Sequence, residues 1–210
     1  MRYPADQKHK TSEKIVRASG RLFRKHGYAA TGVDAVMASA DLTAGGFYSH
    51  FRSKEDLLAA TLDAVFQNAK QERPQALNEL KGPAWLKAFV EFYLSPEHRN
   101  GSDHGCPIST LATEVARVGG KPREVFERHV TGVIDAIARQ FDEQHPDRER
   151  AIASMALCIG GITLARGVGS RKLSEEILAA SRKAAIKEVD GEKTGAPAPS
   201  LEGAYNLQNS

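Results

Sequence analysis

Cys106 is the residue of this sequence whose position is most favourable for chemistry. It directly precedes Pro107, and proline is common at the first position of a helix. Backbone N–H groups at a helix N-terminus stabilise a thiolate, and a protonated His104 would add to that effect. Cys106 is therefore a candidate reactive thiol. The alternative is a structural role, in which a small residue fits a tight turn.

A catalytic or metal site built from the same residues is not supported. A pair of His104 and Cys106, with Glu114 as a third member, would need a hydrogen bond that neighbours in a loop rarely form. The sequence shows no nucleophile elbow and no phosphate-binding loop. Its two cysteines and seven histidines lack the spacing of a structural zinc site. We therefore expect no enzyme, no metal and no cofactor, and we expect Cys158, which lies among apolar residues, to be inert core.

A second chemically informative stretch is TAGGFYSHF, residues 43–51. Gly45 and Gly46 make it a poor helix by propensity, but their lack of side chains lets the backbone approach a groove closely. Tyr48 and His50 can donate hydrogen bonds to phosphates. The residue types point to contacts with a nucleic-acid backbone.

The charge distribution agrees with such contacts. Residues 1–55 hold ten Lys and Arg against five Asp and Glu, a net charge of +5, whereas the remaining 155 residues hold 19 against 21 and carry −2. A basic stripe follows helical spacing: Lys10, Lys14, Arg17, Arg21 and Lys25. This asymmetry is expected of a polyanion-binding head on a neutral body, and a solvated basic surface is the alternative.

Three short helices position the stretch. Apolar periodicity predicts helices over 11–26, 33–40 and 44–50, with Thr31 as a candidate cap of the second and Thr43 as the cap of the third. The last two are joined by a tight turn. This arrangement describes a helix-turn-helix unit in which residues 43–51 form the recognition helix.

The rest of the chain also reads as helices. Ser53 caps a helix that runs toward Glu72, and a polar loop is expected over 95–105. Pro122 is expected at the first position of its helix, and Asp147 caps the next one. The other predicted helices cover 84–94, 107–118, 121–143, 147–168 and 173–188. No segment reads as a strand, so the fold class is all-α with about nine helices, and residues 190–210 have the composition of a disordered tail.

The stretch from Ile15 to Leu57 resembles the N-terminal DNA-binding domain of tetracycline-repressor-type (TetR family) regulators. It contains LFRKHGY and TGVDAVMASADLTAGGFYSHFRSKEDL, and agreement of this length and order is specific. The resemblance implies an all-helical, usually homodimeric regulator with a variable ligand-binding C-terminal domain. It covers about the first quarter of the chain and is only architectural beyond. We expect a DNA-binding domain over 1–52 and a regulatory and dimerisation domain over 53–189.

The resemblance assigns roles to single positions. Thr43 falls where the family has a Ser or Thr that meets the DNA backbone, Tyr48 on its phosphate-contacting Tyr, and Lys54 on the Lys that starts helix four. Asp41 replaces the usual turn glycine, Ala44 stands where Lys or Arg is common, and His50 where an aromatic residue is usual, so the operator sequence does not carry over. The candidate DNA-binding residues are Thr31, Thr43, Ala44, Gly45, Gly46, Tyr48, His50 and Lys54.

Small residues on helix 147–168 mark a candidate dimer interface. Ala153, Ala156, Gly160, Thr163 and Gly167 recur at three- and four-residue steps. Such a stripe lets two helices cross closely, although a buried core helix would show the same pattern. The resemblance implies that helices 147–168 and 173–188 form a four-helix interface in a homodimer. Two DNA-binding heads then imply a roughly palindromic operator of double-stranded DNA.

Aromatic residues of several helices are candidates for lining a ligand pocket, with plain core as the alternative. The candidate lining is Leu62, Phe66, Trp85, Phe89, Phe92, Tyr93, Phe126 and His129. The segment HGCPISTLATEVAR also resembles a TetR subgroup in which a cysteine senses oxidants or electrophiles, which makes Cys106 a candidate redox sensor. The inducer itself is not indicated by any residue.

Composition sets the remaining limits. The chain is 41% hydrophobic and 26% charged, as in ordinary globular proteins, and contains no apolar run long enough to span a membrane. Its polar N-terminus and two cysteines predict a cytoplasmic protein. We expect a transcriptional regulator, a repressor released from its operator by a small molecule or by cysteine modification. The alternatives are a small enzyme or a sequence-indifferent DNA-coating protein.

Overall fold

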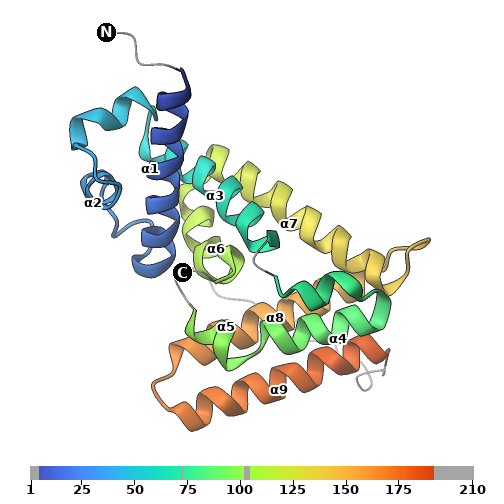
Figure 1. Cartoon of the computed structure of the whole chain (residues 1–210). Coiled ribbons are helices and arrows are strands. Elements are labelled where there is room, and N and C mark those ends of the chain that lie inside the picture. Colours follow the sequence, from blue (N-terminus) through green and yellow to red (C-terminus); the bar gives the residue numbers. More distant parts are fainter. Residues whose placement is uncertain (1–4, 72, 102–104, 192–210) are drawn as a thin grey trace, which may run out of the picture.

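The computed structural model describes residues 5–71, 73–101 and 105–191, and all the regular elements in these ranges are helices, without a strand (Figure 1). The predicted disordered tail lies outside the described residues beyond Gly191. The elements are α1 (Ala5–His26), α2 (Val33–Ser39), the 3₁₀ helix η1 (Ala44–Ser49), α3 (Lys54–Gln71), the 3₁₀ helix η2 (Gln75–Glu79), α4 (Gly82–Tyr93), α5 (Pro96–Asn100), α6 (Pro107–Val118), α7 (Gly120–Phe141), α8 (Arg148–Gly167) and α9 (Arg171–Asp190).

Two residues with positive φ shape the head formed by α1, α2 and η1. Gly27 ends α1 at φ 87°, and Asp41 turns the chain between α2 and η1 at φ 58°. Asp tolerates this left-handed backbone better than most residues, so the turn survives without the usual glycine. Phe23, Val36 and Phe47 are fully buried between the three elements. The predicted helix-turn-helix unit is therefore confirmed.

The head is joined to the body through α3. The hydroxyls of Ser19 in α1 and Thr61 in α3 form a buried hydrogen bond of 2.6 Å. A Cβ at Gly20 would lie 3.0 Å from the Val65 side chain, so the glycine allows the two helices to approach. One hydrophobic core continues from α1 and α2 through α3 into α6 and α7. Movement of α3 therefore has to be transmitted to the head.

The body packs α3, α4, α6, α7, α8 and α9 together, with α8 and α9 side by side at the end farthest from α2 and η1 (Figure 1). Gly161 explains how closely α8 and α9 pack. A Cβ at this position would lie 2.5 Å from the Ser181 hydroxyl oxygen in α9 and 3.0 Å from the Leu94 side chain. Only a residue without a side chain fits there.

Several local expectations are confirmed and others are wrong. The side chains of Ser53 and Asp147 accept hydrogen bonds from backbone N–H groups in the first turns of α3 and α8, as predicted. The segment 95–105 is not simply a loop, because Ser95 caps the short helix α5. Helix α7 begins at Gly120, two residues before Pro122, which is therefore not its first residue.

Of the two threonine caps predicted in the head, the one at Thr31 is wrong and the one at Thr43 is confirmed only in its position. Gly32, not Thr31, is the N-cap of α2. Thr43 is the N-cap residue of η1, but its side chain forms no capping hydrogen bond. No helix within the described ranges is long and apolar enough to cross a membrane.

Candidate functional site

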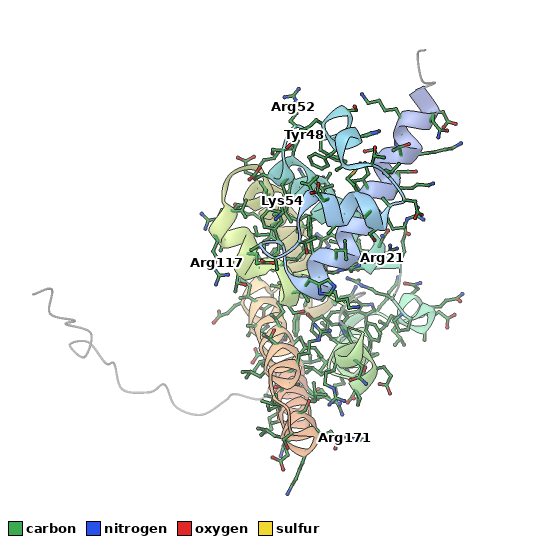
Figure 2. The ribbon with its side chains drawn as sticks, turned by 90° about the vertical axis from the view of Figure 1, so that its left-hand side faces the viewer. Arg21, Tyr48, Arg52, Lys54, Arg117 and Arg171 are labelled. Carbon is green, nitrogen blue, oxygen red and sulfur yellow. The ribbon has the colours of Figure 1, made fainter. Side chains whose placement is uncertain are left out.

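The recognition segment is an exposed 3₁₀ helix anchored by one aromatic residue. Phe47 is fully buried, whereas the Tyr48 ring is 75% exposed and stands at the top of the head in Figure 2. Thr43, Ala44 and Gly45 are exposed, and a Cβ at Gly45 would meet no atom within 4 Å. Two glycines explain why the segment forms a short 3₁₀ turn rather than the predicted α-helix. The segment therefore exposes its backbone at residues 43–45 and the Tyr48 ring to solvent.

Two predicted DNA-binding residues, Lys54 and Thr31, form hydrogen bonds within the protein. The Lys54 ammonium donates a hydrogen bond of 2.7 Å to the Tyr28 carbonyl oxygen and lies 4.2 Å from the centre of the Tyr28 ring. Thr31 is buried and its hydroxyl donates to the Gly27 carbonyl oxygen at 2.7 Å. Thr31 therefore braces the turn between α1 and α2. Burial, followed by Glu55 and Glu114, raises the pKa of Tyr28 to about 12, so the phenol under Lys54 stays neutral.

His50 lies half-buried at the end of η1. Its Nδ1 atom is buried and has no hydrogen-bond partner among the described residues. Burial, with a smaller contribution from Lys8, lowers the pKa of His50 below its usual value. The imidazole is therefore neutral at pH 7 and acts as a hydrogen-bonding group rather than as a cation.

The head that carries Tyr48 also exposes several cations. Lys14, Arg17, Arg21 and Lys25 lie exposed along α1, and Arg52 is exposed directly before Ser53. Figure 2 places Arg52 and Tyr48 together at the end of the molecule opposite Arg171. Arg52 was not among the predicted site residues. Its place next to the recognition segment in the basic part of the sequence is the signal that would have found it.

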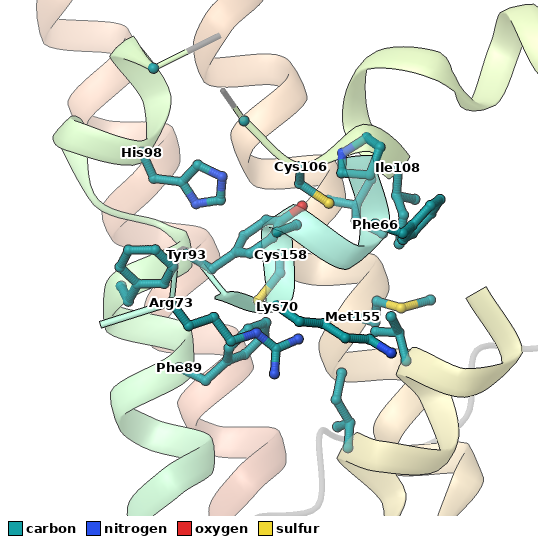
Figure 3. Close-up of a pocket in the computed structure, with 18 of the residues that line it drawn as sticks. Phe66, Lys70, Arg73, Phe89, Tyr93, His98, Cys106, Ile108, Met155 and Cys158 are labelled. Atoms are coloured by element: carbon teal, nitrogen blue, oxygen red, sulfur yellow. The ribbon is translucent and has the colours of Figure 1, made fainter. Parts of the chain in front are cut away.

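A cavity of about 300 Å³ lies between the helices of the body (Figure 3). Four of the eight predicted lining residues do line it: Phe66, Phe89, Phe92 and Tyr93. The other four, Leu62, Trp85, Phe126 and His129, are not part of its lining. The lining includes both cysteines, Cys106 and Cys158, and two basic residues, Lys70 and Arg73, that the aromatic pattern did not include.

The four residues that do not line the cavity belong to the hydrophobic core or pack against the side chains that do line it. Trp85 stacks on Phe89 with ring centres 5.0 Å apart. His129 stacks on Phe66 at 4.6 Å, and its Nε2 lies 2.7 Å from an Asp63 carboxylate oxygen. These rings support the lining side chains without reaching the cavity.

The two cysteines differ in their environment. Cys106 is half-buried, is the N-cap residue of α6 and lines the cavity. Cys158 is buried, as predicted, and burial, followed by the nearby Cys106, raises its pKa to about 12. Cys158 therefore stays a thiol at neutral pH. His104, the proposed neighbour of Cys106, lies outside the described residues.

Helix α6 links the cavity to the head. Glu114 in its third turn accepts hydrogen bonds from the backbone N–H groups of Tyr28 at 2.5 Å and Ala29 at 2.9 Å. Near its start, the Gly105 carbonyl oxygen accepts a hydrogen bond of 3.2 Å from the Arg24 guanidinium. Two helices, α3 and α6, therefore connect the cavity to the DNA-binding head.

The small-residue stripe on α8 is open to solvent within the chain. Ala156, Thr163 and Gly167 are exposed, and a Cβ at Gly160 or Gly167 would meet no atom within 4 Å. Leu164 is 62% exposed and Ile152 46% exposed on the same helix. Large apolar side chains exposed beside small residues are typical of a surface that a partner covers.

Similarity to known proteins agrees with this geometry. Residues 15–61 match the family described as bacterial regulatory proteins, tetR family. The HTH-type transcriptional repressor NemR of Escherichia coli strain K12 is 24% identical over 136 residues, which cover 64% of this chain and 68% of NemR. The matched family segment contains α2, η1 and the Lys54 region, so it covers the exposed recognition segment.

Solved structures share the whole fold. The crystal structure of E. coli NemR in its reduced form gives a TM-score of 0.71 at 22% identity and covers 84% of this chain and 95% of that chain. A regulator from Chloroflexus aurantiacus gives 0.73 at 22% identity, covering 88% and 96%. AibR in complex with isovaleryl coenzyme A and operator DNA gives 0.61 at 18% identity, covering 83% and 97%.

Proposed function

This chain is a TetR-family transcriptional regulator by its DNA-binding domain and its fold, and from this premise we propose that it is a homodimeric repressor of a palindromic operator. The exposed recognition segment with Tyr48 carries the proposal. An inducer that enters the cavity between the body helices releases the DNA. We propose residues 1–52 as the DNA-binding part and residues 53–189 as the regulatory part.

The proposed DNA contacts come from the exposed end of the head. The Tyr48 hydroxyl, the Thr43 hydroxyl and the open backbone at Ala44 to Gly46 contact phosphates and sugars. Arg52 and the basic stripe of α1 add electrostatic attraction. His50, a neutral group, packs at the end of η1. Lys54 stabilises the head through its hydrogen bond to the Tyr28 carbonyl oxygen and lies close to the DNA backbone. Thr31 is left out because its hydroxyl is bound to Gly27.

Dimerisation through α8 and α9 sets the distance between two heads. The open surface at Gly160, Gly167 and Leu164 supports this interface. A ligand in the cavity moves α3 and α6, which both contact the head, and the heads then no longer match two half-sites at a fixed spacing. Movement of α6 reaches the head through two contacts: Glu114 of α6 with the backbone of Tyr28, and Arg24 of α1 with the Gly105 carbonyl oxygen.

Two changes at the exposed end of the head should weaken operator binding. Tyr48→Phe removes a hydroxyl and Arg52→Gln removes a charge, and each lost contact costs about 1 kcal/mol, so a dimer loses about 2 kcal/mol. Arg171→Gln is the matched control, because it removes the same charge at the opposite end of the molecule (Figure 2). Footprinting and gel shifts on the upstream region of the protein's own gene measure the effect. Loss of affinity in Arg171→Gln equal to that in Arg52→Gln would contradict the proposed surface.

Footprinting also tests the function as a whole. A sequence-specific regulator protects one palindromic DNA segment from cleavage, whereas a sequence-indifferent coating protein gives no localised footprint. The exposed position of Tyr48 in a chain with the fold of operator-binding proteins predicts the first result.

Cysteine modification is a second route of release that one observation favours: the half-buried Cys106 lies at the start of α6 and lines the cavity. If the thiol is the switch, peroxide or an electrophile releases the wild-type protein from DNA and fails to release Cys106→Ser. If only the cavity is the switch, release by an inducer persists in Cys106→Ser. Titration of the operator complex with both reagents decides, provided that labelling shows the thiol to be accessible.

A further inference from the structure

Arg73 lies at the wall of the cavity, and no carboxylate of the described residues pairs with it. It follows α3 in the chain, is half-buried, and burial lowers its pKa below the usual value. Its guanidinium lies 5.6 Å from the centre of the Phe89 ring and 5.9 Å from that of Trp85. Among the described residues no carboxylate forms an ion pair with it, and no hydrogen bond from its five N–H donors is found. The two rings hold the guanidinium in place, and its N–H groups are available to donate hydrogen bonds to a ligand.

The charges around Arg73 do not cancel it. Lys70 in the last turn of α3 also lines the cavity, and Figure 3 shows both side chains reaching into the same region. Glu97 is the one carboxylate in the described lining; it is exposed and forms no ion pair with either cation. Burial, followed by Arg166, lowers the pKa of His98 to about 4, so His98 is neutral at pH 7. The cavity therefore attracts anions.

Two more polar atoms at the cavity lack partners. The Tyr93 hydroxyl and the His98 Nδ1 are buried without a hydrogen bond among the described residues, and Tyr93 is only 6% exposed. Burial, with help from the neighbouring Cys106, raises the pKa of Tyr93 well above its usual value, so it remains a neutral donor. Leaving buried polar groups unpaired is costly, which favours a ligand that pairs with them. A carbonyl, hydroxyl or carboxylate oxygen satisfies this requirement.

The remaining surface of the cavity is apolar. Phe66, Phe89, Met155 and Ile159 line it, and its volume of about 300 Å³ is at the lower end of the range for small-molecule sites. Flat rings and a flexible thioether accept a compact apolar body. A bare inorganic anion would leave this apolar surface unused.

We propose that the inducer of this protein is a small organic carboxylate with a compact apolar body, whose carboxylate is bound by Arg73 and Lys70. The body of the ligand lies against the aromatic and aliphatic side chains, and an oxygen of the ligand pairs with Tyr93 or His98. This inference rests on the proposed function, because it names the chemical class of the molecule that enters the same cavity. It assigns Arg73 as the residue that determines the charge of that molecule.

Three probes of nearly equal shape test the charge requirement: 3-phenylpropanoate, its uncharged amide 3-phenylpropanamide, and the cationic 3-phenylpropylamine. Trp85 is the only tryptophan of the chain and stacks on Phe89, so its fluorescence reports binding directly, and calorimetry confirms it. The carboxylate should bind wild-type protein about tenfold or more tightly than the amide, since hydrogen bonds to ionised groups are about twice as strong. The amine should bind weakest.

Arg73→Gln should reduce the preference for the carboxylate at least severalfold, and Arg73→Gln combined with Lys70→Gln should remove the preference, because both cations of the lining are then gone. Arg73→Lys should retain part of the preference because it keeps the charge. Lys81→Gln is the control, since Lys81 is exposed and lies outside the cavity lining. Thermal unfolding of each variant shows that it is folded. Equal affinity for carboxylate and amide in the wild-type protein, tighter binding of the amine, a preference of wild-type size in Arg73→Gln, or no binding of any probe would overturn the proposal.

The same titrations with operator DNA separate this proposal from the function on which it depends. The carboxylate should release wild-type protein from the operator and fail to release Arg73→Gln at the same concentration. A protein that binds its operator but is not released by the bound carboxylate refutes the ligand class and leaves the repressor function intact. A protein that binds the carboxylate but protects no DNA site refutes the repressor function instead.

Discussion

Raising the salt concentration from about 50 to about 200 mM should weaken operator binding by roughly 10³- to 10⁴-fold. If each subunit makes about three or four phosphate contacts, the logarithm of the binding constant should fall with the logarithm of salt at a slope of roughly −5 to −7. The net charge of the first 55 residues and the exposed cations of the head are the reasons for this expectation. Fluorescence anisotropy with a labelled operator over a salt series measures the slope.

The variants of the head refine this result. Arg52→Gln should make the slope less steep by about 2 for the dimer, because it removes one cationic contact from each subunit. Tyr48→Phe should weaken binding at every salt concentration without changing the slope, since it removes no charge. A slope near zero in the wild-type protein, or one that Arg52→Gln leaves unchanged, would contradict a phosphate-binding surface at this end of the molecule.

Leucine at two adjacent glycines of α8 should produce opposite defects. Gly160 faces open space, so Gly160→Leu is expected to leave the folded chain intact and to convert the dimer into monomers. Gly161 faces Ser181 and Leu94, so Gly161→Leu overpacks the contact between α8 and α9 and should lower the free energy of unfolding of the chain itself by about 1–3 kcal/mol or more. Sedimentation gives the oligomeric state, and urea unfolding gives the stability.

Because a dimer is stabilised by association, both variants are measured over a range of protein concentrations. Gly160→Leu should retain the helical circular dichroism of the wild type and approach the unfolding midpoint of wild-type protein diluted to monomers. Gly161→Leu should unfold early at every concentration. Monomeric wild-type protein at micromolar concentration, or a Gly160→Leu variant that still dimerises with wild-type affinity, would contradict the proposed interface.

Local features of the fold could be predicted because they depend on a few neighbouring residues. Ser53 and Asp147 cap their helices as expected. The helix-turn-helix unit could be predicted for the same reason, since apolar spacing fixes which faces of short helices are buried. The errors occurred where two local signals competed, as at Thr31 and Gly32 before α2.

The spacing of aromatic residues did not predict which of them line the cavity. Phe89 and Trp85 lie one helical turn apart on the same side of α4, yet only Phe89 reaches the cavity, while Trp85 packs behind it. Which of two neighbouring rings faces a space depends on the helices packed against them, and these come from distant parts of the chain. Arg73 was missed because a single arginine after a helix carries no local signal that it will be buried beside two rings.

The sequence by itself determined the all-helical class, the position of the recognition segment with Tyr48 and the concentration of positive charge in the head, because propensity, apolar spacing and charge are local properties. Tertiary structure alone decided what connects the head to the body: Glu114 binds the backbone of Tyr28, and Arg24 binds that of Gly105, across more than 80 residues of chain. It also decided that Gly161 faces α9 while Gly160 faces solvent. The physical reason is that such contacts depend on the rotation and crossing of whole helices, which the summed packing of many side chains sets.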